Sequence, residues 1–177
     1  MLFRSGSWNP HLRRFRSPFA FRGLASVDHQ LSNSLLRLAA GRASISRLEQ
    51  SLLRNFRKYA HAQSTPRVES IWHWLALGQH HGLPTRLIDW TYSPFVALHF
   101  ATEHPDEYGV DGVVHCVNFV QANTLLPKRL KTILEEEQSD TFTVDMLDTF
   151  RSLKALDRLA REPFVLFIEP QIGRAHV

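Results

Sequence analysis

The sequence predicts an α+β fold, in which a small mixed sheet and several packed helices form a single domain. Two kinds of stretch predict it: some show the three- and four-residue spacing of amphipathic helices, and short extended stretches lie between them. Proline or glycine stands at many of the boundaries. Helices grouped between a few strands are typical of the α+β class. A chain of 177 residues suits one domain and can bury a sizeable core.

The composition excludes several classes of protein. With 44% hydrophobic residues, 12 Phe, 4 Trp and a net charge of +4, the chain is not disordered along its whole length. Cys116 is the single cysteine, which excludes a disulfide scaffold and fits a reducing cytosol. No window holds the roughly 18 uninterrupted apolar residues of a membrane span. We therefore expect a cytoplasmic protein without a membrane partner, and its oligomeric state stays open.

The first half of the chain predicts a basic lead-in, one strand and two helices. Residues 1–17 are polar, basic and without a clear period, so we expect a loosely ordered lead-in. Residues 19–24 alternate aromatic with small or charged residues, as a short strand does. Apolar residues recur at helical spacing over 45–63 and over 67–80. A proline separates these two helices, and Gly82 is a suitable end for the second.

The second half begins with an apolar helix. Ser93 suits the N-cap of this helix, and Pro94 suits its first turn, where a missing N–H costs nothing. Residues 95–101 are apolar almost all round, so we expect the helix to be central and buried. The remaining elements come in this order: a strand over 112–120, helices over 123–138 and 143–161, and a strand over 164–168.

The last six residues are expected to have a different origin from the rest. Residues 172–177 read Ile-Gly-Arg-Ala-His-Val, which is the translation of a common short-read sequencing adapter up to a stop codon. We therefore expect a fragment read from assembled, metagenomic DNA, with native sequence to about Gln171 and a natural protein that continues beyond it. On this interpretation Arg174 and His176 have no functional role.

Polar residues are densest over 79–93, between two mostly apolar helices. This block contains Gln79, His80, Thr85, Arg86, Asp89, Trp90, Thr91 and Ser93. Polar groups between buried elements must be hydrogen-bonded or they lower stability. One interpretation is structural: Arg86 and Asp89 form a buried ion pair, while nearby hydroxyls (Thr85, Ser93) cap backbone ends. The other interpretation is a pocket that binds a polar ligand.

Two motifs of the chain resemble those of a known family. Phe21-Arg22-Gly23 is an aromatic-Arg-Gly triplet, and residues 79–101 match the pattern QHxGLPTRLLDWTxxPxxALxFA with conservative departures such as Ile88. Both are similar to the motifs of the FRG domain family, and the resemblance covers about residues 19–120. We expect one FRG-type domain over 18–171. The family is described mainly as uncharacterised, in bacterial and phage-associated proteins, with some members near defence and mobile elements.

The leading functional hypothesis is a transferase that resembles ADP-ribosyltransferases and uses NAD as its substrate. In the arginine-type members of that class, an aromatic-Arg-Gly strand places Arg against a phosphate or ribose. A later Ser/Thr strand supports the nicotinamide ribose, and a downstream Glu stabilises the oxocarbenium-like centre. Guanidinium suits its task because it offers a fixed fork of donors to phosphate.

This resemblance implies a set of site residues around one polar pocket, to which Arg22 and the 79–93 block both contribute. The implied catalytic residues are Arg22, His80, Arg86, Asp89 and Glu169, with a residue beyond Gln171 as the alternative to Glu169. The implied ligand-binding residues are Phe21, Gly23, Gln79, Thr85, Trp90, Thr91 and Ser93. The spacing of His80, His81 and Asp89 matches no strong metal-ligand signature, so no metal is expected.

Two other classes of function stay open, and so does the question whether the chain is an enzyme. A nucleic-acid-directed binding or hydrolytic protein is motivated by the basic stretch over 13–22, and it predicts binding that weakens strongly with salt. A non-catalytic module that senses a small ligand through the same pocket is the third hypothesis. Such a module would be stabilised by its ligand without transforming it.

Overall fold

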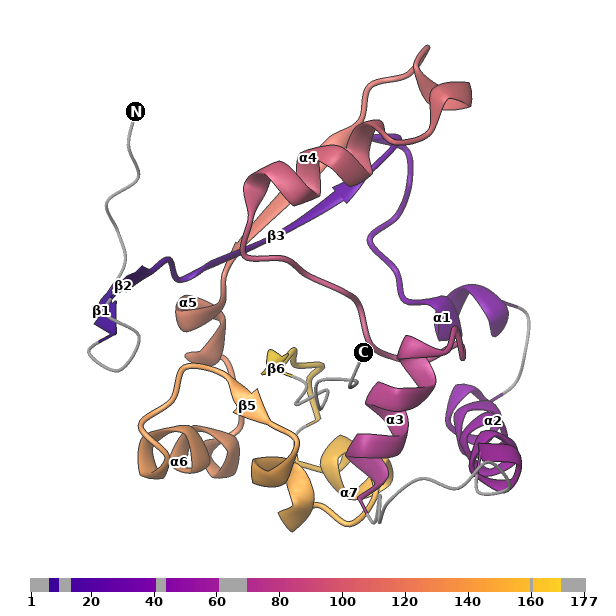
Figure 1. Ribbon diagram of the computed structural model, residues 1–177. Coiled ribbons are helices and arrows are strands. Elements are labelled where there is room, and N and C mark those ends of the chain that lie inside the picture. Colours follow the sequence, from indigo (N-terminus) through magenta and orange to yellow (C-terminus); the bar gives the residue numbers. More distant parts are fainter. Residues whose placement is uncertain (1–6, 10–13, 41–43, 61–69, 160, 170–177) are drawn as a thin grey trace. The chain divides into compact units, whose positions relative to one another are not determined.

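The structure is a computed structural model, and it describes residues 7–9, 14–40, 44–60, 70–159 and 161–169 (Figure 1). Runs of helices separate a few short strands along the chain, so the fold class is α+β, as predicted. The chain divides into two compact units, each built from two separate stretches. Unit 1 contains Met1–Leu31 and Asp89–Leu125, and unit 2 contains Ser32–Ile88 and Leu126–Val177.

The centre of unit 1 is an antiparallel pair of strands, β3 (Phe19–Leu24) and β4 (Val113–Asn118). Both strands lie where the sequence predicts them. β4 is shorter than predicted because Asn118 accepts a hydrogen bond from the N–H of Gln121 and so begins a short helix, α5 (Phe119–Asn123). The pair aligns the aromatic-Arg-Gly triplet of β3 with the middle of β4.

A short hairpin precedes β3 in unit 1. It pairs β1 (Ser7–Asn9) with β2 (Arg14–Arg16), and Trp8 lies opposite Phe15. The sequence predicts only a loosely ordered lead-in here. The difference has a simple cause, because three-residue strands are too short to show the two-residue period by which strands are predicted.

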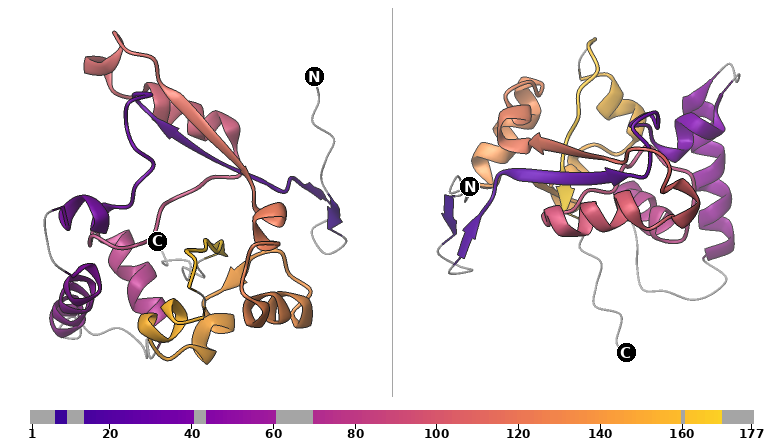
Figure 2. Two further views of the ribbon diagram at one scale, coloured as in Figure 1. Left: turned by 180° about the vertical axis from the view of Figure 1, so that it is seen from behind. Right: turned by 90° about the horizontal axis from the view of Figure 1, so that it is seen from above.

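Helix α4 (Pro94–Thr102) packs along β3 in unit 1, as both views of Figure 2 show. It begins as predicted, since the Ser93 hydroxyl accepts a hydrogen bond from the N–H of Val96 at 3.4 Å. The expectation of a buried helix is wrong. Ala97 and Ala101 are its buried residues, whereas Phe95 is 80% exposed. Small residues let the helix approach the strand closely and leave the larger apolar side chains outside. A short 3₁₀ helix, η2 (Pro105–Glu107), comes after α4.

The first part of unit 2 contains three helices, α1 (Ser34–Leu38), α2 (Ile45–Ala60) and α3 (Ile71–His80). α2 and α3 confirm the predicted helices over the described residues, while residues 61–69 lie outside them. Gly82 stands just after α3 with a φ of 77°, which confirms the predicted stop, because glycine adopts this left-handed conformation without strain. α1 is not predicted, because five residues are too few to show a helical period.

The second part of unit 2 departs most from the prediction. Its elements are α6 (Lys128–Glu136), β5 (Phe142–Thr143), η3 (Asp145–Thr149), α7 (Leu153–Asp157) and β6 (Ile168–Glu169). The single helix predicted over 143–161 is therefore wrong. Phe150 has an extended backbone, and the Ser152 hydroxyl caps a new helix at the N–H of Ala155. The apolar spacing that resembled one helix comes from two short helical segments facing one core. The strand predicted over 164–168 is confirmed at Ile168 alone, because β6 begins there and pairs in parallel with β5.

The described hydrophobic core of unit 2 forms around α3, α6, η3 and α7. Its buried members are Trp72, Leu75, Leu126, Leu130, Leu134, Phe142, Val144, Leu147, Phe150, Leu153 and Leu156. The indole N–H of Trp72 donates to the carbonyl oxygen of Phe150 at 3.0 Å, so the largest side chain of the core keeps its polar atom paired. This core supports α3, whose end leads directly into the polar block.

Candidate functional site

The aromatic-Arg-Gly triplet and the Asp89–Ser93 segment lie together in unit 1. The N–H of Phe21 donates to the carbonyl oxygen of Thr91 at 2.7 Å, and the N–H of Thr91 donates back to Phe21 at 2.9 Å. This antiparallel bridge lies on the edge of β3 that β4 does not occupy, because a strand can pair along only two edges. The last part of the polar block therefore continues the sheet of unit 1.

Arg22 connects the same two segments through its side chain. Its Nη1 donates a hydrogen bond to the main-chain carbonyl oxygen of Asp89 at 2.6 Å. A guanidinium carries five N–H donors in a planar fork, so protein groups can fix its position while it also donates to an anion. The half-buried Arg22 side chain is thus positioned by the segment that the sequence predicts as its neighbour.

Gly23 has a different role, which is to let α4 pack closely against β3. A Cβ added at Gly23 would collide with the carbonyl oxygen of Ala97 and would lie 2.8 Å from the backbone nitrogen of Ala101. Both atoms belong to the helix backbone and cannot move aside independently. Each residue of the triplet therefore contacts the stretch over 89–101 in a different way. Phe21 bonds through its backbone and Arg22 through its side chain, while Gly23 lies against the helix because it has no side chain.

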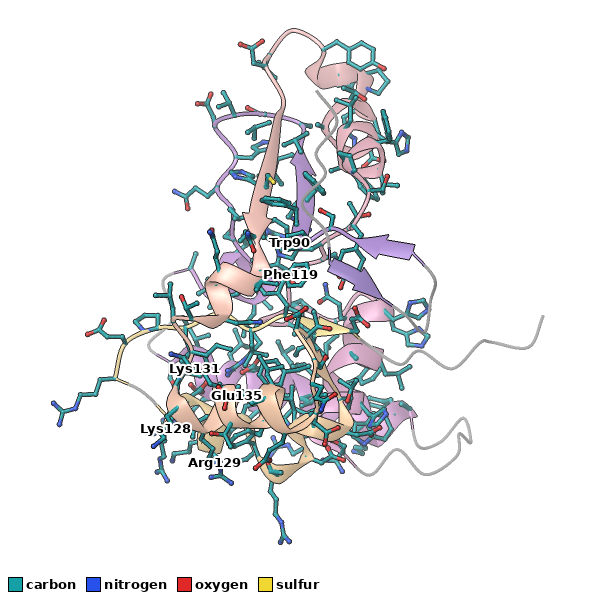
Figure 3. The ribbon with its side chains drawn as sticks, turned by 90° about the vertical axis from the view of Figure 1, so that its left-hand side faces the viewer. Trp90, Phe119, Lys128, Arg129, Lys131 and Glu135 are labelled. Carbon is teal, nitrogen blue, oxygen red and sulfur yellow. The ribbon has the colours of Figure 1, made fainter. Side chains whose placement is uncertain are left out.

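Two hydroxyls downstream of Asp89 support backbone ends. The Thr91 side-chain oxygen accepts from the N–H of Ser93 at 3.1 Å, and the Ser93 hydroxyl caps α4. The structural interpretation of Ser93 is therefore confirmed. Trp90 lies between Asp89 and Thr91 in the sequence, and Figure 3 shows it with Phe119. The buried Phe119 ring packs edge-on against Tyr92, with ring centroids 6.0 Å apart.

His115 is a residue of this region that the sequence reasoning missed. It lies directly opposite Arg22 in the β3–β4 pair. Its Nε2 atom is buried, and within the part of the chain that the structure describes no group forms a hydrogen bond with it. Only the register of two strands far apart in the sequence places it beside Arg22, so no local signal could have found it.

Arg86 belongs to unit 2, where it binds two carboxylates. Its Nε and Nη2 donate to the two oxygens of Glu49 at 2.8 and 2.5 Å, and its Nη1 donates to Asp157 at 2.6 Å. Glu49 is buried on α2. The expected ion pair between Arg86 and Asp89 is therefore wrong, because the carboxylates that Arg86 binds are the buried Glu49 and the more exposed Asp157 of the same unit. Asp89 belongs to the other unit.

The electrostatics of this cluster favour a charged Arg86. Burial of the guanidinium lowers the pKa of Arg86, whereas its hydrogen bonds to Glu49 and Asp157 and their negative charges raise it. The hydrogen bonds and negative charges together outweigh the effect of burial, so the pKa of Arg86 lies above its ordinary value. The cluster thus holds a permanent positive charge between two carboxylates, an arrangement typical of a structural ion pair.

Thr85 joins the block to the first helix of unit 2. This residue is fully buried, and its hydroxyl donates to Oε1 of Gln79 and accepts from the N–H of Leu87. Its backbone N–H donates to the Ser34 hydroxyl at 3.1 Å, and its carbonyl oxygen accepts from the N–H of Leu35 at 3.2 Å. These bonds satisfy the polar atoms of Thr85 within the fold and confirm its predicted role in capping backbone groups.

The other predicted residues of unit 2 lie at element ends. His80 is exposed at the end of α3, with its ring centroid 5.3 Å from that of His81. Glu169 lies on β6 opposite Thr143, and residues 170–177, with Gln171, Arg174 and His176 among them, lie outside the described residues. Over the described part of the chain, no group of three or more His, Cys, Asp or Glu side chains could hold a metal ion.

The predicted site residues thus fall into two sets. Unit 1 brings together Phe21, Arg22, Gly23, Asp89, Trp90, Thr91 and Ser93, while unit 2 holds Gln79, His80, Thr85, Arg86 and Glu169. The boundary between the units passes between Ile88 and Asp89, inside the polar block. A common pocket for Arg22 and Arg86 therefore stays a prediction.

This α+β architecture, with an aromatic-Arg-Gly strand bound to an Asp-Trp-Thr segment, defines the class of domain. A model of the FRG domain matches residues 17–109, just over half of the chain. The chain therefore belongs to the FRG domain family. Neither the search of curated proteins nor the search of solved structures found a match. Among the described helices, none has the length and apolar character needed to cross a membrane.

Proposed function

We propose that unit 1 binds a phosphate-bearing nucleotide at Arg22, and that NAD is the substrate of an ADP-ribosyl transfer. The observation that carries this proposal is the hydrogen bond from Arg22 Nη1 to the carbonyl oxygen of Asp89. It holds a half-buried guanidinium at the point where the two most distinctive motifs of the sequence meet. A fixed, planar guanidinium suits phosphate because its fork matches a pair of phosphate oxygens.

The neighbours of Arg22 supply the other groups that a nucleotide needs. Trp90 offers an aromatic surface on which an adenine or nicotinamide ring can stack. The hydroxyls of Thr91 and Ser93 accept hydrogen bonds from backbone N–H groups, and within the described residues neither O–H donates one. Each can therefore donate to a ribose hydroxyl or phosphate. In this proposal Arg86 and Thr85 act structurally, because their hydrogen bonds to Glu49, Asp157 and Gln79 shape the first part of the block.

The proposed reaction transfers ADP-ribose from NAD to an acceptor. A nucleophile of the acceptor forms a bond to C1′ of the nicotinamide ribose while the glycosidic bond to nicotinamide breaks. Nicotinamide leaves with the electron pair of that bond, and the acceptor's proton passes to a base. A carboxylate near the ribose would stabilise the positive charge that develops there. The assignment of this carboxylate to Glu169, or to a residue beyond Gln171, stays a prediction from the resemblance.

Binding and turnover of the full chain test this proposal separately. Calorimetric titration with NAD, ADP-ribose and a short single-stranded DNA gives the affinities, and chromatography measures nicotinamide release. Binding of NAD with release of nicotinamide supports the proposal, whereas binding without release favours the ligand-sensing module. DNA binding that weakens steeply with salt, without nucleotide binding, favours the nucleic-acid hypothesis. If no nucleotide binds, the proposal is wrong.

A further inference from the structure

His115 of β4 has a buried polar atom that is not among the groups of the proposed site. Its Nε2 is removed from solvent, and no described group forms a hydrogen bond with it. A buried nitrogen without a partner lowers the stability of a fold, so each such atom in a native protein needs an explanation, and a ligand that accepts its hydrogen bond is one. His115 is therefore a candidate for binding rather than for stability.

The register of the sheet places His115 beside Arg22. The two residues lie directly opposite each other in the antiparallel pair, so their side chains extend from the same face at neighbouring positions. A Cβ at Gly23, the next residue of β3, would point at the backbone of α4. Since side chains alternate along a strand, Arg22 and His115 extend from the face that α4 does not cover.

The chemistry of the pair selects an anion. A guanidinium is a donor without an acceptor, and an imidazole N–H is also a donor, so one oxygen-rich, negatively charged group can accept from both. We propose that His115 is a further ligand-binding residue, whose Nε2–H donates to a phosphate oxygen of the nucleotide held by Arg22. This inference rests on the proposed function and deepens it by assigning a second donor to the phosphate.

The test compares a shape-conserving and a donor-conserving variant of His115 in the full chain. His115→Phe removes the nitrogen while keeping a planar ring, and His115→Gln keeps an N–H donor. His99→Phe is the matched control, since His99 lies on α4 of the same unit and its side chain is 70% exposed. The measurements are the melting temperature without ligand, the Kd for ADP-ribose, and the ¹⁵N resonance of His115 Nε2 during titration with ADP-ribose.

We expect His115→Phe to melt at or above the wild-type temperature without ligand, because it removes an unsatisfied polar atom. Its affinity for ADP-ribose should fall about tenfold or more, as expected for losing a hydrogen bond to a charged group. His115→Gln should retain part of the affinity, His99→Phe should bind like wild type, and the Nε2 resonance should shift on binding.

Two results overturn this inference while leaving the proposed function intact. One is Arg22-dependent binding of ADP-ribose that His115→Phe leaves unchanged. The other is a clear fall in the melting temperature of unliganded His115→Phe, which would show that the imidazole has a structural partner. Failure of the wild-type chain to bind ADP-ribose at all would overturn both the inference and the proposed function.

Discussion

Arg22 donates a hydrogen bond to the main-chain carbonyl oxygen of Asp89, which lies 67 residues later in the sequence. The flanking residue Phe21 forms a backbone bridge with Thr91, and Gly23 lies against the backbone of α4. The aromatic-Arg-Gly triplet and the Asp-Trp-Thr segment are thus two halves of one substructure. Changes in either half should therefore affect the position of the other.

Gly23→Ala should destabilise unit 1 strongly. The added methyl group would meet the carbonyl oxygen of Ala97, so α4 must shift away from β3. Overpacking of this kind costs about 1–3 kcal/mol, and more where backbone must move. Gly109→Ala is the matched control, because a Cβ at Gly109 has no neighbour within 4 Å. Urea unfolding measures both variants, and equal stabilities would contradict the close approach of α4.

Arg86→Met should destabilise unit 2 because it leaves the buried carboxylate of Glu49 without its partner. Breaking a buried ion pair on one side typically costs about 3–5 kcal/mol. Asp157 is 42% exposed in its side chain, so Asp157→Asn should cost less than about 1 kcal/mol. The double variant Glu49→Leu/Arg86→Met removes both buried charges and should be more stable than Arg86→Met alone. Urea unfolding in which the double variant is the less stable of the two would contradict the structural ion pair.

The stabilisation by Arg86 should not vary with pH in the neutral range. Its carboxylate partners raise its pKa above the ordinary value, so its contribution is fully present below the pKa of the unfolded chain and is lost only as pH rises through the higher folded value. The difference in unfolding free energy between wild type and Arg86→Lys isolates the fork geometry from the charge. A large change of that difference between weakly acidic and weakly alkaline buffer would point to another titrating group.

Thr85→Val should lower the unfolding free energy although it keeps the shape of the side chain. The valine cannot donate to the side-chain oxygen of Gln79 or accept from the N–H of Leu87. These two polar groups would then lose their partner beside residue 85, which is fully buried. A buried polar group left without its partner costs about 1–3 kcal/mol. Thr102→Val on the exposed α4 surface is the control, since its hydroxyl bonds only to carbonyl oxygens of its own helix in the described structure. Similar costs for both variants would argue against a structural role of Thr85.

Local signals in the sequence predict much of the fold. Ser93 and Pro94 place the start of α4, Gly82 places the end of α3, and alternation places β3. These features depend on residues within one turn of each other, so they can be predicted from the sequence alone. The residues of the candidate site in unit 1 are predicted in another way, because the family resemblance links two contiguous motifs that lie far apart in the sequence.

Other features depend on partners far along the chain, and the sequence could not predict them. Arg86 binds Glu49 and Asp157, which are 37 and 71 residues away, rather than a residue of its own block. The position of His115 beside Arg22 requires the register of β3 and β4. The exposure of Phe95 could not be read from a helix that is apolar on every side, because such a helix has no periodicity to mark its inner face.

The affinity of an Arg22 variant for ADP-ribose tests the central claim most directly. Arg37→Lys is a closely matched control, because Arg37 also donates from Nη1 to a main-chain carbonyl at 2.6 Å, that of Ser32. Arg22→Lys keeps the charge but loses the planar fork, so we predict binding about tenfold or more weaker than wild type, with Arg37→Lys unchanged. Equal affinities of Arg22→Lys and wild type, measured by calorimetry on the full chain, would contradict the claim that Arg22 holds the phosphate.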